Sequence, residues 1–184
     1  MTSVSRDTIL IAPIGDFAAD ILSAIEDMIP PIFGLPCRIE PLLDNIDFAW
    51  NPERRQFLST IILAQLSDKA PADVFKIIAL TRKDLFIPIL TYVYGEAQLG
   101  GTSCIVSTCR LDGGISHVGQ RVLYLERISK EVIHELGHTF NLRHCKDHQC
   151  LMHYCRSISD VDEKNSQLCR YCQVLLNDQL KNTG

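Results

Sequence analysis

Four residues in the C-terminal half of the chain have the types and spacing of a metal-dependent hydrolytic site. His134 and His138 are four positions apart, so on a helix both imidazoles lie on one face, roughly 6 Å apart along the axis, and can bind one ion. Glu135 follows the first histidine directly, which places a carboxylate beside the open side of the metal as a general base. His144 is a candidate third ligand. The pattern predicts a catalytic zinc site.

His144 reaches the same ion only if the helix ends soon after His138. A helix continuing to His144 would turn about 1000° from His134 and rise roughly 15 Å, away from the metal. We expect the helix to end at Asn141, because asparagine is the residue after glycine that most readily adopts the left-handed conformation. Three neutral imidazoles then leave the fourth zinc position for water, as in catalytic zinc sites.

The composition is that of a globular protein with one hydrophobic core. The chain has 184 residues, of which 46% are hydrophobic and 22% charged, and its formal net charge is −4. Nucleic-acid binding needs a basic surface, and the sequence contains no run of lysine and arginine. No apolar run reaches the ~18 residues of a membrane helix, and acidic residues interrupt any signal-peptide core. We expect a cytoplasmic monomer that binds neither nucleic acid nor membranes.

Four of the eight cysteines have metal-ligand spacing. Cys145 and Cys150 form Cys-x4-Cys, and Cys169 and Cys172 form Cys-x2-Cys. In a cytoplasmic chain such pairs favour zinc over disulfides, and four thiolates make the closed site of a structural zinc. We interpret the other four as buried or half-buried free thiols: Cys37, Cys104, Cys109 and Cys155.

Residues 134–172 resemble the archaemetzincins, a branch of the metzincin zinc metallopeptidases that has four cysteines after the third histidine. The shared pattern runs from His-Glu-x-x-His through His144 to Cys-x4-Cys-x-Met and Cys-x2-Cys, with Asn141 in place of the usual glycine. The resemblance implies hydrolysis of peptide bonds by a zinc-activated water, with Glu135 as the general base. It also implies two zinc ions per chain, one catalytic and one structural.

The same resemblance implies roles for residues around the zinc site. Met152 matches the methionine of the Met-turn, an apolar floor beneath the three histidines. Tyr154 resembles the tyrosine of the astacin branch and is a candidate hydroxyl donor to an oxyanion. An edge strand near residues 103–110 would hold a peptide or protein substrate in extended form. We interpret His148 and His153 as surface residues.

Apolar runs and helical periodicity predict alternating strands and helices in the first half of the chain. Such an order gives right-handed crossovers and a parallel sheet. Two further strands follow without a helix between them, so at least one should be antiparallel. The predicted strands are residues 8–14, 37–43, 74–81, 88–94 and 103–111, and the predicted helices are residues 16–28, ended by Pro30 and Pro31, and residues 51–66.

The second half is predicted to contain the active-site helix at residues 119–140 and a C-terminal helix at residues 165–180. His117 lies in the loop before the first of these. The fold class is α/β (α+β): a metzincin-like, mixed twisted sheet of about five strands with backing and active-site helices, plus a small zinc-stabilised helical subdomain. Residues 1–144 and 145–184 form the two parts of one compact catalytic domain.

Three functions fit these patterns. A zinc metallopeptidase is the leading one, since Glu135 and all three histidines are present, whereas a pseudoenzyme usually lacks one of them. A noncatalytic zinc-binding module that docks a protein partner is the alternative from another class. Hydrolysis of a non-peptide amide or ester would use the same chemistry, and the sequence leaves open the choice between endopeptidase and aminopeptidase.

Overall fold

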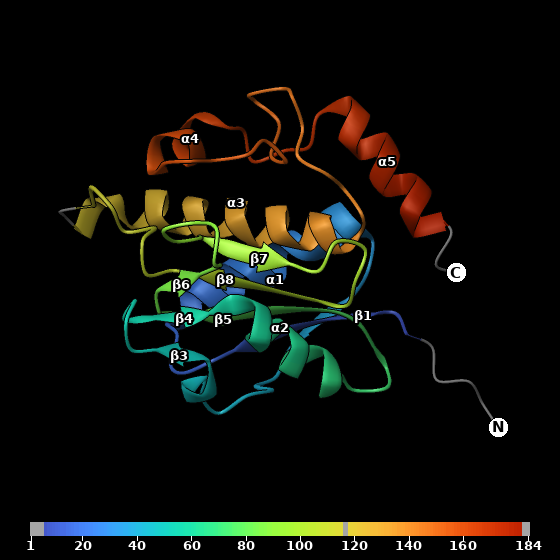
Figure 1. Ribbon diagram of the computed structural model, residues 1–184. Helices are drawn as coiled ribbons and strands as arrows, with labels where there is room; N and C mark the ends of the chain where they lie inside the picture. The colour runs from blue at the N-terminus through green and yellow to red at the C-terminus, as the bar shows by residue number, and fades with distance from the viewer. Residues whose placement is uncertain (1–5, 116–117, 182–184) are drawn as a thin grey trace.

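A five-stranded mixed sheet forms the centre of the protein, shown in Figure 1 as a computed structural model that describes residues 6–115 and 118–181. The first four strands in spatial order are parallel, and the fifth is antiparallel to its neighbour. The predicted mixed sheet is therefore confirmed. The strands, in spatial order, are β2 (Cys37–Ile39), β1 (Thr8–Pro13), β5 (Val74–Thr81), β8 (Ser103–Ser107) and β7 (Gly95–Ala97).

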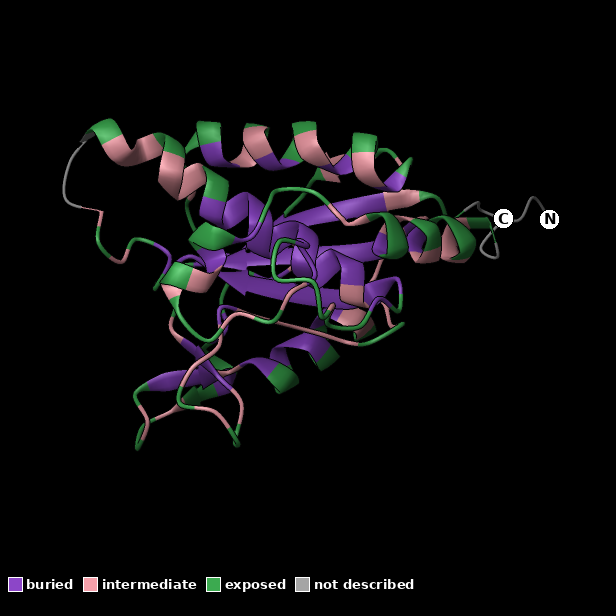
Figure 2. Cartoon of the chain, turned by 90° about the horizontal axis from the view of Figure 1, so that it is seen from above, coloured by how far each residue is buried: buried purple, intermediate pink, exposed green. Residues whose placement is uncertain are grey.

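Helices cover both faces of this sheet. α1 (Ala19–Phe33) and α3 (Arg121–Thr139) pack on one face, and α2 (Ser59–Asp68) packs on the other (Figure 1). Near-continuous apolar runs suit strands that are covered on both faces, and the central strands are buried along most of their length (Figure 2). α3 matches the predicted active-site helix. A short helix, η2 (Val118–Gln120), precedes it, and the predicted loop residue His117 lies outside the described residues.

The helix predicted at residues 51–66 is wrong in its first half. Trp50–Asn51 and Gln56–Leu58 form an antiparallel hairpin, and the helix begins only at Ser59. The turn of this hairpin is stabilised by the Asn51 side chain, whose Oδ1 accepts a hydrogen bond from the Arg54 N–H at 2.9 Å. The hairpin belongs to a small second sheet that was not predicted, formed by β3 (Trp50–Asn51), β4 (Gln56–Leu58) and β6 (Leu85–Phe86). A short helix that was also not predicted, η1 (Asp47–Ala49), directly precedes β3.

The predicted end of the first helix before Pro30 is also wrong, because α1 continues through both prolines to Phe33. Pro30 has no N–H, which leaves the Glu26 carbonyl without its helical partner. The Cys37 thiol donates to that carbonyl at 3.4 Å. Phe33 is buried, so the extra turn adds apolar packing, and the helix ends at Gly34 with a left-handed φ of 66°.

The predicted edge strand is wrong as well. β8 lies between β5 and β7 and is buried throughout, so it has no free edge. The predicted strand at residues 88–94 is mostly a turn, and the antiparallel edge strand is β7, which lies between the two strands predicted at residues 88–94 and 103–111. β2 is likewise shorter than the predicted strand at residues 37–43.

The C-terminal segment packs on the side of α3 that faces away from the sheet (Figure 1). It contains α4 (Ile158–Glu163), which was not predicted, and α5 (Arg170–Lys181), which begins five residues later than the predicted helix. Lys164 is fully buried and forms an ion pair with Glu131 of α3 at 2.8 Å. A buried pair of this kind fixes one segment against the other, since either charge alone would be costly there. No helix among the described residues is long and apolar enough to cross a bilayer.

Candidate metal centre and active-site cleft

α3 ends in a tight left-handed turn directly after its second histidine. Phe140 is the C-cap residue, and Asn141 follows with a φ of 63°, as predicted. The Asn141 N–H donates to the His138 carbonyl at 2.9 Å, and the Leu142 N–H donates to the Gly137 carbonyl at 3.0 Å. These two bonds define a Schellman motif, which reverses the chain and directs the next residues back along the helix.

The end of α3 is also bonded to the sheet and to the loop between β7 and β8. Lys76 of β5 is buried, and its ammonium donates to the Thr139 carbonyl at 2.8 Å and to the Gly101 carbonyl at 2.7 Å. The Gly100 N–H donates to the His138 carbonyl at 2.9 Å. Burial lowers the pKa of Lys76 to about 8, so at neutral pH it still carries the positive charge that a helix C-terminus favours. The end of α3 is thus fixed from two directions.

The turn brings three imidazoles together. One ring nitrogen from each of His134, His138 and His144 lies within 4.8 Å of the others. The Nε2 atoms of His134 and His138 are 3.2 Å apart, close to the about 3.3 Å that two nitrogens on a tetrahedral zinc require. The Nδ1 atoms of these two rings donate to the carbonyls of Leu151, at 2.9 Å, and Leu142, at 2.7 Å. Both Nε2 lone pairs are therefore free to bind a metal.

The electrostatic state of the three rings also suits a metal. Burial lowers the pKa of His134 and of His138 below the usual histidine range. Burial, with a contribution from His138, lowers the pKa of His144 to about 4. Neutral imidazole is the form that coordinates zinc. The donor set, its spacing and its protonation therefore fit a zinc ion.

Met152 lies directly against the helix at Gly137. A Cβ atom built on Gly137 would be 2.6 Å from the Met152 sulfur, so only glycine leaves room for this contact. The methionine is fully buried, and its carbonyl accepts from the Cys145 N–H at 2.9 Å. This places an apolar side chain against α3 at Gly137, and its role as the floor of the histidine cluster stays a prediction.

Glu135 lies on α3 against the edge strand. It is buried, and burial together with the nearby Glu131 carboxylate raises the pKa of Glu135 well above the usual range. A Cβ atom on Gly95 of β7 would be 2.6 Å from Glu135 Cγ and 2.7 Å from the Ile105 carbonyl oxygen. Gly95 therefore provides the space that the Glu135 side chain occupies. No sequence signal marks Gly95, because residues 95–101 lie between two predicted strands and belong to neither.

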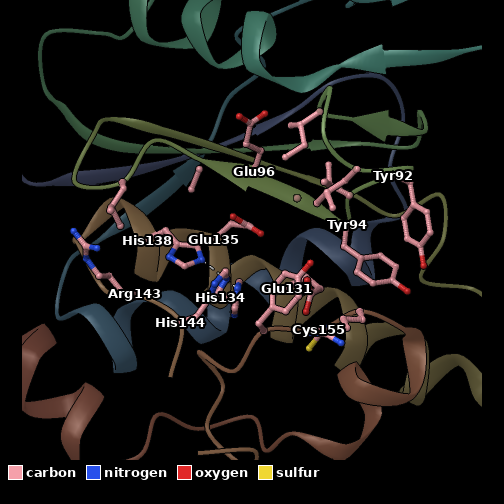
Figure 3. Close-up of a pocket in the computed structure, with 18 of the residues that line it drawn as sticks. Tyr92, Tyr94, Glu96, Glu131, His134, Glu135, His138, Arg143, His144 and Cys155 are labelled. Carbon is pink, nitrogen blue, oxygen red and sulfur yellow. Dashed lines mark hydrogen bonds between the residues drawn. The ribbon is translucent and has the colours of Figure 1, made fainter. Parts of the chain in front are cut away.

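The edge strand itself is anchored to α2. The Glu96 carboxylate accepts from the Ser59 hydroxyl at 2.5 Å and from the Thr60 hydroxyl at 3.0 Å, both in the first turn of the helix. A carboxylate is favoured at a helix N-terminus by the helix dipole. Figure 3 shows Glu96 on the far side of the strand from the histidines.

The outer edge of β7 is open to the cleft. The Ser107 N–H donates to the Tyr94 carbonyl at 2.7 Å. In the same register, Gly95 lies opposite Val106 and Ala97 lies opposite Cys104 of β8. In an antiparallel pair the main-chain groups of successive residues alternate between the two sides of the strand. The N–H and C=O groups of Gly95 and Ala97 therefore point away from β8.

The histidines, Glu135 and β7 border a cleft of about 850 Å³ (Figure 3). Tyr154 lines it, with its ring 5.0 Å from that of His144. His148 is exposed, as predicted for a surface residue. His153 is only half-buried, and its Nδ1 lies 3.0 Å from the Cys145 carbonyl. Other lining residues come from the loop before β7, from α3 and from the C-terminal segment: Ile87, Leu90, Tyr92, Tyr94, Glu131, Arg143, Cys155 and Arg156.

A second candidate metal site consists of Cys145, Cys150, Cys169 and Cys172. One sulfur from each lies within 4.8 Å of the others, and none forms a disulfide. The sulfurs of Cys145 and Cys169 are 3.8 Å apart, which equals the about 3.8 Å between two thiolates on a tetrahedral zinc. The predicted grouping is therefore present. Among the other cysteines Cys109 is exposed, contrary to the prediction, whereas Cys37, Cys104 and Cys155 are buried or half-buried.

The fold and the α3 residues are those of a zinc metallopeptidase. Residues 38–178 match the family described as Peptidase family M54. The chain belongs to this family, the archaemetzincins.

Relatives resemble the chain along most of its length. It is 33% identical over 167 residues to an archaemetzincin from Halobacterium salinarum, covering 89% of this chain and 95% of that protein. It is 35% identical over 172 residues to one from Methanocaldococcus jannaschii, covering 93% of each. The crystal structure of archaemetzincin from Methanopyrus kandleri superposes with a TM-score of 0.82 at 30% identity over 96% of each chain. That from Archaeoglobus fulgidus, complexed with malonate, has a TM-score of 0.78 at 32% identity over 91% and 99%.

The left-handed turn predicts opposite effects of two substitutions at position 141. Asn141→Gly should bind zinc as tightly as the native chain, because glycine adopts a positive φ without strain, whereas Asn141→Val should weaken binding, because its branched side chain collides with the backbone there. Zinc affinity of the histidine site, measured by chelator competition at fixed pH, checks this. Equal affinities in the two variants would show that the turn does not control His144.

The cysteine cluster predicts unequal effects of two serine substitutions. Cys169→Ser should lower the melting temperature strongly, because structural zinc sites contribute ~10–16 kcal/mol in zinc-finger peptides. Cys37→Ser should lower it little, because a hydroxyl can also donate to the Glu26 carbonyl. Melting temperatures of both zinc-loaded variants test this. Equal losses would contradict a metal role for the cluster.

Proposed function

We propose that this archaemetzincin hydrolyses peptide bonds at a zinc ion held by His134, His138 and His144, with Glu135 as the general base. The observation that carries the proposal is the position of Glu135, which follows the first ligand on α3 and lines the same cleft as the three imidazoles. Zinc, when bound, supplies a Lewis acid that lowers the pKa of a water and polarises a carbonyl.

Glu135 is suited to move a proton within the cleft. Its burial and the nearby Glu131 carboxylate both raise its proton affinity, so it accepts a proton from water more readily than an exposed carboxylate would. The protonated side chain can then deliver this proton to the nitrogen of the leaving amine. Gly95 leaves the side chain room at the wall of the cleft.

The peptide substrate would pair with β7. The outward main-chain groups of Gly95 and Ala97 offer hydrogen bonds to an extended peptide, as in other strand-addition complexes. Such bonds do not depend on the side chains of the peptide, so they position substrates of varied sequence. This proposal retains the predicted peptide partner and moves its binding strand from residues 103–110 to β7.

Two further roles belong to the C-terminal segment. The hydroxyl of Tyr154 is a candidate donor to the oxyanion, since the ring stands in the cleft beside His144. A second zinc ion, bound by Cys145, Cys150, Cys169 and Cys172, would have a purely structural role, because four thiolates leave no open coordination position.

Substituting the general base tests the reaction. Glu135→Gln should keep the zinc, because the carboxylate is not a ligand, and should lower turnover by ~10²–10⁴-fold, as for other positioned acid–base groups. Cleavage of a diverse peptide mixture, followed by mass spectrometry, measures turnover, and atomic absorption measures zinc. A Glu135→Gln preparation, free of contaminating protease, that cleaves at the native rate would refute the proposal. Native protein that binds zinc and cleaves no peptide would favour the noncatalytic alternative.

Filling the space beside Glu135 should impair the same step. Gly95→Ala adds a methyl group within 2.6 Å of Glu135 Cγ, so the carboxylate must move. We expect a large loss of kcat, of roughly 10²-fold, with the zinc retained. Gly113→Ala is the matched control, because its new methyl group would have only the Arg110 carbonyl nearby, at 3.5 Å. Full activity of Gly95→Ala would show that this contact does not position Glu135.

A further inference from the structure

An arginine that lies outside the cleft donates hydrogen bonds to both ends of a turn that forms part of the cleft wall. The guanidinium of Arg54, in the turn between β3 and β4, donates from Nη1 to the Ile87 carbonyl and from Nη2 to the Leu90 carbonyl, each at 3.1 Å. Its Cζ also lies 4.4 Å from the centre of the Phe86 ring. A planar guanidinium can donate to two carbonyls at once, whereas a lysine ammonium has no such fork.

The turn held by Arg54 has little other support. Residues 87–91 belong to no strand, and a single bridge between Leu85 and Val93 closes the segment. At its tip the Ile89 side chain is 86% exposed. Besides the bonds from Arg54, the main anchor is Gln56 of β4, whose side chain donates to the Thr91 carbonyl at 3.1 Å. The position of the turn therefore depends on the β3–β4 hairpin.

This turn supplies an apolar wall to the cleft. Ile87 and Leu90 are half-buried and line the cleft, and residues 87–91 contain no charged side chain. The segment then continues through Tyr92 directly into β7, the strand proposed to pair with the substrate. A displacement of the turn would change the apolar wall and the entry to the edge strand together.

We infer that Arg54 is a positioning residue for substrate binding, which holds residues 87–91 as an apolar wall that takes an apolar side chain of the peptide. The inference rests on the proposed function. Without the two hydrogen bonds the turn samples other positions, and part of the binding free energy is spent on ordering it. The loss falls on substrate binding and leaves the zinc site intact, because the side-chain hydrogen bonds and the ring contact of Arg54 go to Ile87, Leu90 and Phe86, none of which is a proposed zinc ligand.

Two hydroxamates distinguish the contribution of the apolar wall to ligand binding from that of the zinc site. Acetohydroxamate binds only the metal, whereas a peptidyl hydroxamate with leucine side chains also needs the apolar wall. With the zinc-loaded full chain, Arg54→Gln should raise the Kd of the peptidyl compound roughly tenfold and change that of acetohydroxamate by less than about twofold, as measured by calorimetry. Arg55→Gln is the matched control: Arg55 is exposed and adjacent, and both affinities should stay native.

Hydrogen exchange gives a readout that needs neither zinc nor turnover. The amides of Ile87 and of residues 89–92 should exchange faster in Arg54→Gln than in Arg55→Gln, with the rest of the chain unchanged; Pro88 has no amide hydrogen. The inference is overturned if these amides exchange at the native rate, or if both hydroxamates weaken equally or not at all. Failure of acetohydroxamate to bind the native protein would instead contradict the proposed zinc site, and the exchange rates would still decide whether Arg54 holds the turn.

Discussion

The architecture of the site depends on one constraint: three imidazole nitrogens must meet within the coordination distance of one ion. His134 and His138 satisfy it through helical spacing alone, and His144 satisfies it only because α3 ends at once. The left-handed conformation of Asn141 ends the helix, and the hydrogen bond from Lys76 to the Thr139 carbonyl connects this end to β5, the central strand of the sheet. The position of the histidine cluster is thus fixed by the end of a helix and by the core strand bonded to it.

The same helix connects the histidine cluster to the edge strand β7 and to the C-terminal segment. Glu135 lies against β7 at Gly95, and Glu131, one turn earlier, pairs with the buried Lys164. The edge strand and the segment after His144 are therefore both held against α3, the helix that carries Glu135. This explains how side chains far apart in sequence face one cleft (Figure 3).

Residue type and spacing made the histidine and cysteine clusters predictable, whereas tertiary contacts determined the elements that were predicted wrongly. The histidine and cysteine groups and the positive φ of Asn141 follow from spacing and residue type, so the sequence located them correctly. α1 continues past Pro30 because Cys37, from another element, satisfies the freed carbonyl. The edge strand was misplaced because three residues starting at Gly95 carry no strand signal of their own. Glu131 lies four residues before Glu135, a spacing that could have indicated its place beside the cleft.

X-ray absorption at the zinc edge, combined with the zinc content of the purified full chain, tests the central claim most directly. Two sites with separate ligand sets predict two zinc ions per chain. They also predict an average shell of about two sulfurs near 2.3 Å and about two nitrogen or oxygen atoms near 2.0–2.1 Å for each zinc. One zinc per chain with only sulfur neighbours would show that the three histidines do not hold a metal, and would contradict the account.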